Sequence, residues 1–267
     1  MKISIFISLF FIITHLSGQE IAIDQSFDIG YEPIAASFDR QGHLYFAKSG
    51  GGIDKFDQNG KILYHFSPQK KGEPTIIEAW QGLRTFVHYR NFQEYLFLDR
   101  FLNSSERYSL DFSQSRNFSG LVTLSGDNNL WAINDQDQSL QKIDINNQEI
   151  LFETKLNLSL EYEYLDIQFI RAYQNYLFIS DASLGILMFD NLGNYVDRLI
   201  SNEGIAFFSF YKNELIFLQE NKLRQIDLYT KKEREISIPD LPYQFAFMEN
   251  NKLLLIRNQT VDIIKIN

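Results

Sequence analysis

An all-β fold, a six-bladed β-propeller of four-stranded blades, is predicted by two short patterns that recur in step and by the absence of helical periodicity. The first pattern is a turn residue, a leucine and a β-rich run, as in GHLYFAK at Gly42–Lys48. The second is an apolar strand that ends in aspartate, twelve to fifteen residues after each leucine. Two patterns that keep this spacing six times indicate six copies of one unit.

Six leucines mark the units at a mean spacing of about 42 residues, which is typical of a four-stranded propeller blade. They are Leu44, Leu96, Leu130, Leu177, Leu215 and Leu253. The aspartates that follow are Asp57, Asp111, Asp144, Asp190 and Asp227, and Lys265 takes the sixth place. An aspartate before a turn accepts hydrogen bonds from the amides that follow it, so we expect a structural role for this position.

Further β-rich segments lie before each leucine and after the aspartates, which makes four strands per unit. The last unit stops after its third strand, and the segment EIAIDQSFDI at Glu20–Ile29 precedes the first unit without belonging to it. We expect this N-terminal strand to complete the last blade and close the ring, because closure removes the exposed sheet edges.

Two segments interrupt the period. The spacing between the first two leucines is longer than the mean because of the residues Ser67–Gly82, and we interpret these residues as a long loop. The segment DFSQSRNFSG, Asp111–Gly120, is a poor fourth strand for the second unit. The second blade is therefore the one whose strands the sequence defines least.

The N-terminus is typical of a signal peptide, with Lys2 followed by the apolar run Ile3–Ile13 and small residues up to position 18. A membrane anchor is the alternative, but the run is shorter than the ~20 residues that a span needs. We expect residues 1–18 to be cleaved and 19–267 to form the propeller domain, with no later transmembrane span. The predicted location is the periplasm or the cell exterior.

Composition excludes several classes of function. The chain has no cysteine, so thiol catalysis, cysteine-ligated metals, disulfides and a lipid-modified N-terminal cysteine are absent. The formal net charge of −9 argues against binding to nucleic acid or to anionic lipid. The mature chain has three histidines, His43, His65 and His88, none of them paired at metal-ligand spacing, and we expect a structural role for each. Gly50–Gly52 is followed by no helix and is interpreted as a turn.

Two units carry a family resemblance. The stretches LYFAKSGGGIDKFDQNGKIL (Leu44–Leu63) and LFISDASLGILMFDNLGNYVDRL (Leu177–Leu199) resemble the repeat of the NHL family of six-bladed propellers. The other four units match loosely. The resemblance implies a propeller fold and a binding platform, and some relatives of this kind are calcium-dependent lactonases or other hydrolases.

One set of residues is predicted to form a binding rim. Each lies four residues after its leucine, at the end of a second strand, so all should lie on one face of the ring. They are Lys48, Arg100, Asn134, Asp181, Gln219 and Arg257, with Asp99 as an alternative to Arg100. The alternative interpretation is that these polar residues are simply strand ends exposed to solvent. The three cations favour an anionic ligand, and no catalytic set, metal site or cofactor is predicted.

Three functions follow from these patterns. The first is a non-catalytic protein-binding or scaffold module of the bacterial envelope, with a protein partner there. The alternative is a calcium-dependent, lactonase-like hydrolase with Asp99, Asn134 and Asp181 gathered at one mouth of the central channel. A third is glycan binding through Trp80, Trp131 and exposed tyrosines.

Overall fold

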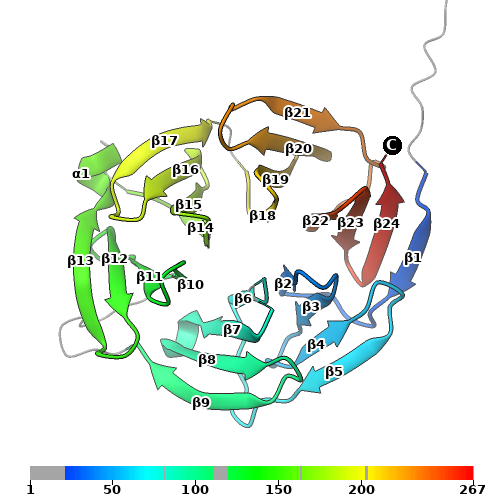
Figure 1. Ribbon diagram of the computed structural model, residues 1–267, viewed down its shortest axis with the longest axis horizontal. Coiled ribbons are helices and arrows are strands. Elements are labelled where there is room, and N and C mark those ends of the chain that lie inside the picture. Colours follow the sequence, from blue (N-terminus) through cyan, green and yellow to red (C-terminus); the bar gives the residue numbers. More distant parts are fainter. Residues whose placement is uncertain are drawn as a thin grey trace, which may run out of the picture.

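The computed structural model is a ring of six antiparallel four-stranded sheets, which confirms the predicted propeller (Figure 1). The structure describes residues 22–80, 82–110, 120–160, 162, 164–201 and 204–266. The predicted signal peptide lies outside these residues and stays a prediction, and Asp111 lies outside them as well. Within the described ranges no helix is long and apolar enough to cross a membrane.

The first three blades each use four strands that follow one another in the chain. Blade one consists of β2 (Ala35–Phe38), β3 (Leu44–Ala47), β4 (Ile53–Phe56) and β5 (Ile62–Phe66). Blade two consists of β6 (Ile76–Glu78), β7 (Arg84–Tyr89), β8 (Glu94–Asp99) and β9 (Ser104–Ser109), with the 3₁₀ turn η1 (Arg90–Phe92) inside it. Blade three consists of β10 (Val122–Leu124), β11 (Leu130–Asn134), β12 (Ser139–Asp144) and β13 (Glu149–Lys155), followed by the short helix α1 (Leu156–Leu160).

Blades four and five repeat this order, whereas blade six borrows a strand from the other end of the chain. Blade four consists of β14 (Ile167–Tyr173), β15 (Tyr176–Asp181), β16 (Gly185–Asp190) and β17 (Tyr195–Ile200). Blade five consists of β18 (Phe208–Tyr211), β19 (Glu214–Gln219), β20 (Lys222–Asp227) and β21 (Glu233–Ile236). Blade six consists of β22 (Phe245–Glu249), β23 (Lys252–Arg257), β24 (Thr260–Lys265) and β1 (Gln25–Asp28).

The direction of the strands defines two faces of the ring. First strands start, and second strands end, on one face, which we call the upper face. First strands end, and third strands end, on the opposite face, the lower face. This follows from the antiparallel order of every blade, because each strand reverses the direction of its predecessor.

The second strands form the core because they are covered on both sides by neighbouring blades. All four residues of β3 are buried. Leu44 and Phe46 contact the largest apolar cluster, while Tyr45 and Ala47 point to the other side and pack with residues of blade two. The outer strand β5 is mostly exposed. Alternating side chains of one strand therefore join two blade interfaces.

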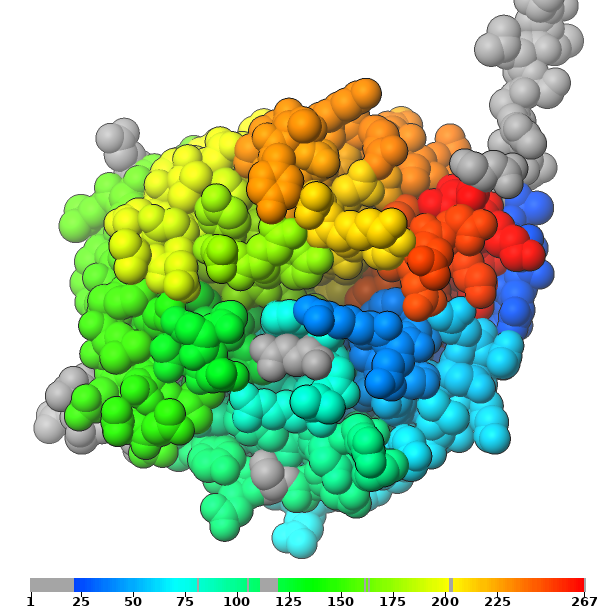
Figure 2. Space-filling model, in the orientation of Figure 1, coloured from blue at the N-terminus to red at the C-terminus, as the bar shows by residue number. Residues whose placement is uncertain are grey.

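The ring closes through β1, as predicted. Residues 25–28 pair antiparallel with residues 260–263 of β24, so the first and last segments lie side by side (Figure 2). Ser26 Oγ donates to Asp262 Oδ1 at 2.5 Å, and the Phe27 ring stacks on Phe56 of blade one at 6.4 Å. Gly60 lies against that ring, and a Cβ there would come within 2.6 Å of it. Phe27 thus joins blade six to blade one.

The aspartate that ends each third strand holds the turn to the fourth strand. Asp190 Oδ1 accepts from the amides of Leu192 at 2.8 Å and Asn194 at 2.9 Å, and its other oxygen accepts from the Asn194 side chain at 2.9 Å. Burial opposes the ionised form, but these hydrogen bonds outweigh it and hold the pKa of Asp190 below its usual range. Equivalent bonds are made by Asp57, Asp144 and Asp227. The predicted structural role is confirmed for these four.

Removing one such carboxylate should weaken the protein measurably. We expect Asp190→Ala to lower the free energy of unfolding by about 1–2 kcal/mol, because three local donors lose their acceptor. Urea denaturation would measure this. Asp197→Ala, a substitution on the neighbouring outer strand, serves as the control with an expected change near zero. Equal effects of the two substitutions would contradict the turn-forming role.

Blade two differs from the prediction. Leu44 pairs with Phe56, the residue before Asp57, and the corresponding pair in blade two is Thr85 with Leu98. Leu96 therefore lies on the third strand, and Asp99 takes the place that we predicted for Asp111. Its oxygens accept from Phe101 and Asn103 in the same pattern as those of Asp190.

The segments around blade two are reassigned accordingly. The stretch Ser67–Gly82, predicted to be a loop, contains the first strand β6. The fourth strand is β9, Ser104–Ser109, which pairs with β8, and residues 111–119 lie outside the described ranges. With Thr85 as the reference, the spacing between the first two units becomes 41 residues, close to the mean of the repeat.

Candidate functional site

The predicted rim residues of five blades lie at the ends of second strands on the upper face. Asn134, Asp181, Gln219 and Arg257 end β11, β15, β19 and β23, and Lys48 follows β3. In blade two the corresponding residue is Tyr89, because His88 pairs with Ile76 as Ala47 pairs with Ala35. Asp99 and Arg100 instead occupy the β8–β9 turn on the lower face, where Arg100 lies over the Phe101 ring. Their predicted place in the rim is wrong.

Two polar rim side chains, those of Asn134 and Asp181, are engaged in the turns that follow them. Asn134 Oδ1 accepts from the Gln136 amide at 3.1 Å, and Asp181 Oδ1 accepts from the amides of Ser183 at 2.9 Å and Leu184 at 2.8 Å. Asn134, Asp181 and Gln219 are only 6%, 1% and 8% exposed. The geometry of Asn134 and Asp181 is that of turn-forming residues, and a binding role for all three stays a prediction.

The two rim cations are neutralised by carboxylates of the adjacent third strands. Lys48 Nζ lies 3.1 Å from Asp54 Oδ2, and Arg257 Nε donates to Asp262 Oδ2 at 2.8 Å. The bond to Asp262 raises the pKa of Arg257. Both carboxylates are almost fully buried. The local excess of positive charge that favoured an anionic ligand is therefore not present at these two positions.

The upper face carries a cavity that the rim prediction did not locate. It has a volume of about 790 Å³ and is lined by the segments that lead into the first strands. These segments converge because each one crosses from the outer strand of one blade to the inner strand of the next. They are residues 32–36, 73–77, 168–169, 204–207 and 243–245, with side chains added from Asn91 and Leu218.

Two Glu-Pro pairs hold equivalent positions in adjacent blades. Pro33 and Pro74 precede residues whose amides bond to the second strand: Ile34 N donates to Ala47 O at 2.9 Å, and Thr75 N donates to His88 O at 2.8 Å. Proline fixes φ and favours an extended conformation in the residue before it, so both glutamates enter the cavity wall in the same way. The repeated Glu-Pro dipeptide was the available sequence signal, and its second copy, Glu73-Pro74, lies inside the segment interpreted as a loop.

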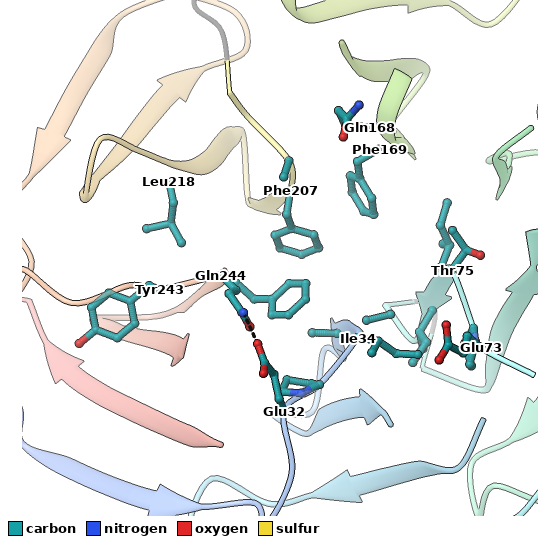
Figure 3. A pocket seen from close by; sticks show the side chains of 18 of the residues that line it. Glu32, Ile34, Glu73, Thr75, Gln168, Phe169, Phe207, Leu218, Tyr243 and Gln244 are labelled. Carbon is teal, nitrogen blue, oxygen red and sulfur yellow. Dashed lines mark hydrogen bonds between the residues drawn. The ribbon is translucent and has the colours of Figure 1, made fainter. Parts of the chain in front are cut away.

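Aromatic rings form one wall of the cavity. Phe207 lies 4.9 Å from Phe169 and 5.0 Å from Phe245, measured between ring centroids, so three blades contribute to one cluster. Figure 3 shows Phe169, Phe207 and Ile34 facing the same space from different segments. Ile34 is 39% exposed, which is high for an isoleucine next to the first strand of a blade.

Polar groups lie at the edge of this apolar space. Glu32 Oε1 accepts from Gln244 Nε2 at 2.6 Å, a bond that joins blade one to blade six (Figure 3). Glu73 Oε1 accepts from Ser49 Oγ at 3.1 Å. Among the described lining residues there are two carboxylates and no lysine, arginine or histidine. The cavity therefore suits an apolar group with a neighbouring positive charge.

A second cavity of about 460 Å³ opens on the lower face, and it contains one of the two tryptophans. Trp80 packs edge-on against Tyr173 and carries the guanidinium of Arg40 at 5.7 Å from its ring centroid. Trp131 is instead 1% exposed and packs against Phe152 inside blade three. The prediction that both tryptophans form an exposed glycan platform is therefore wrong for Trp131.

Solved structures share the fold at low sequence identity. Virginiamycin B lyase from Staphylococcus aureus is 12% identical, with a TM-score of 0.63 over 91% of this chain and 99% of its own. A streptogramin B lyase is 18% identical, with a TM-score of 0.57 over 91% and 87%. BamB from Moraxella catarrhalis is 12% identical, with a TM-score of 0.51 over 88% and 85%. No protein-family model and no curated protein matches the chain.

These likenesses define the class: the chain is a six-bladed β-propeller module. At such identities they show the fold alone. They include a lyase, BamB and WD40 domains, and so they assign neither an enzymatic nor a binding role to this chain. The NHL repeat remains a resemblance.

Proposed function

We propose that this chain is a binding propeller of the bacterial envelope or cell exterior, which docks a protein partner on the upper-face cavity without catalysing a reaction there. The observation that carries the proposal is the combination of an open aromatic wall with two carboxylates at its edge. An apolar or aromatic side chain of the partner would enter the cavity and bury Ile34, and a neighbouring lysine or arginine would meet Glu32 or Glu73. Buried aromatic and arginine anchors dominate the energetics of such interfaces.

The calcium-dependent alternative has less support. It requires Asp99, Asn134 and Asp181 at one mouth of the central channel. Asp99, however, lies on the lower face, and Asp181 Oδ1 already accepts hydrogen bonds from two backbone amides. Within the described residues no group of three or more histidine, aspartate or glutamate side chains is placed to hold a metal ion. We therefore base no functional proposal on those three residues.

A photo-crosslinking amino acid at position 34 tests the proposed docking site. We expect a crosslinked partner from a native envelope extract when the probe replaces Ile34, and none when it replaces Leu192, which is 67% exposed in a lower-face turn. Mass spectrometry identifies the partner. Binding of the identified partner to Ile34→Glu should weaken at least tenfold, because a buried unpaired carboxylate costs more than 1.4 kcal/mol.

The matched control is Leu192→Glu, which adds the same charge on the opposite face and should leave the affinity unchanged. Melting temperatures of both variants show whether the fold is retained. Unchanged affinity of the Ile34→Glu variant, or equal crosslinking from positions 34 and 192, would contradict docking at the cavity.

A further inference from the structure

The outer half of blade one contains a hydroxyl, an imidazole and a carboxylate in line. Asp54 on β4 lies directly opposite His65 on β5 in the strand register. Ser67 follows two residues after His65, so its side chain lies on the same side of the strand. Ser67 Oγ is 2.7 Å from His65 Nε2, and His65 Nδ1 is hydrogen-bonded to Asp54 Oδ1. The two ring nitrogens thus join the serine to the aspartate.

The carboxylate at the inner end is held in its ionised form. Its other oxygen accepts from Lys48 Nζ at 3.1 Å. Burial alone would favour the protonated acid, but the hydrogen bonds from His65, Lys48 and Tyr31 outweigh it and keep the pKa of Asp54 below its usual range. An ionised Asp54 accepts a proton-bearing Nδ1, which leaves Nε2 as the basic nitrogen facing the serine.

Access increases along the three residues. The side chain of Asp54 is 5% exposed and that of His65 is 43% exposed, and Ser67 lies at the surface. Gly52 makes room for the side chain of Lys48, because a Cβ there would lie 2.6 Å from Lys48 Cε. The order from buried acid to exposed hydroxyl is the one that an activated serine nucleophile requires.

We propose that Ser67 is a nucleophile for acyl transfer from carboxylic esters, with His65 as its general base and Asp54 as the positioning residue. Ser67 Oγ forms a bond to the ester carbonyl carbon while its proton passes to His65 Nε2. The ester carbon–oxygen bond then breaks, and the leaving alcohol takes that proton. Water, deprotonated in turn by His65, attacks the acyl group and releases the carboxylic acid and free Ser67.

Blade one supplies matched controls for each part of this arrangement. Ser49 is an exposed serine on the same face that contacts Glu73 instead of a histidine. His43 contacts Asp39 through Nδ1 at 3.0 Å, but within the described residues no serine hydroxyl is bonded to its ring. Both residues lie in connecting segments of blade one and lack the nucleophile–base contact.

A fluorophosphonate probe tests the reactivity of Ser67 directly. The serine oxygen bonds to phosphorus, the phosphorus–fluorine bond breaks, and the proton leaves through His65 with fluoride. Peptide mass spectrometry measures the labelling of Ser67 and Ser49 in the same sample. We expect Ser67 to label about 100-fold faster than Ser49, and His65→Gln to remove this difference, in keeping with general-base effects of about 10²–10⁴. In the His43→Gln variant, Ser67 should be labelled at the wild-type rate.

The positioning role and the ester substrate have their own readouts. Asp54→Asn should lower the Ser67 labelling rate at least tenfold, because the amide can donate to Nδ1 and reverse the tautomer. Hydrolysis of p-nitrophenyl butyrate should be lost in Ser67→Ala. Circular dichroism shows whether each variant folds. If Asp54→Asn does not fold, Ser67→Ala still tests the proposal, because Ser67 lies at the surface. Equal labelling of Ser67 and Ser49, or unchanged labelling in a folded His65→Gln variant, would overturn the proposal.

Discussion

A chain that begins at Ile29 and therefore lacks β1 should melt roughly 10–20 °C below the chain that retains it. Its sixth blade would lose the pairing with β24, the hydroxyl partner of Asp262, and the contact of Phe27 with Phe56. Three to four hydrogen bonds and one partly buried phenylalanine amount to about 4–6 kcal/mol. A domain of this size loses about 2–4 °C per kcal/mol. Thermal unfolding followed by circular dichroism measures the change.

Two substitutions separate the contributions to closure. Phe27→Ala keeps the backbone pairing and should account for about 2–3 kcal/mol of the loss. Gln25→Ala alters only an exposed position of the same strand and should shift the melting temperature by about 1 °C or less. If the melting temperature does not change when residues 22–28 are removed, β1 contributes no stability to the ring.

The stability of the protein should fall in mild acid because of His88. Its side chain is completely buried, and neither ring nitrogen has a hydrogen-bond partner among the described residues. Burial, with a smaller contribution from the charge of Arg90, lowers the pKa of His88 from 6.5 to about 3. The unfolded chain takes up a proton below about pH 6.5, whereas the folded chain does so only near pH 3. Unfolding is therefore favoured as the pH falls through this window.

The expected slope is about 1.4 kcal/mol per pH unit well below pH 6.5, which gives about 2.3 kcal/mol between pH 6.5 and pH 4.5 because the unfolded histidine is half protonated at pH 6.5. Urea denaturation of wild type and His88→Leu at both pH values isolates this contribution, because other titrating groups act in both proteins. We expect the variant to lose less stability between the two pH values by that amount. Parallel losses in the two proteins would show that His88 does not titrate in this way.

Most of the fold could be predicted because the blades repeat their local chemistry. The leucine of the second strand and the aspartate of the third strand recur since each blade has the same neighbours and the same turn. Blade two was assigned wrongly because its third strand, EYLFLD, has the sequence pattern of a second strand, with Leu96 as the apparent leucine of the repeat. The true second strand has Thr85 there, a residue that no leucine pattern detects.

The sites could be predicted less well because they depend on contacts between distant segments. Lys48 and Arg257 were placed on the correct face, but their neutralising partners Asp54 and Asp262 lie on a neighbouring strand. The upper-face cavity combines five connectors from different blades, and connectors have no periodic pattern. His65 and Ser67 also appeared unremarkable, since only the register of β4 against β5 brings Asp54 opposite His65.

Ring closure also has a consequence for the folding rate. Ser26 and Asp262 are 236 positions apart, so β1 joins β24 only after the intervening chain has collapsed. Pairings across such separations form late and slow the approach to the native state. Until β1 pairs with it, the edge of β24 is bare and open to strand-to-strand aggregation. Amide protons of β1 and β24 should accordingly exchange with solvent sooner than those of β3 or β15.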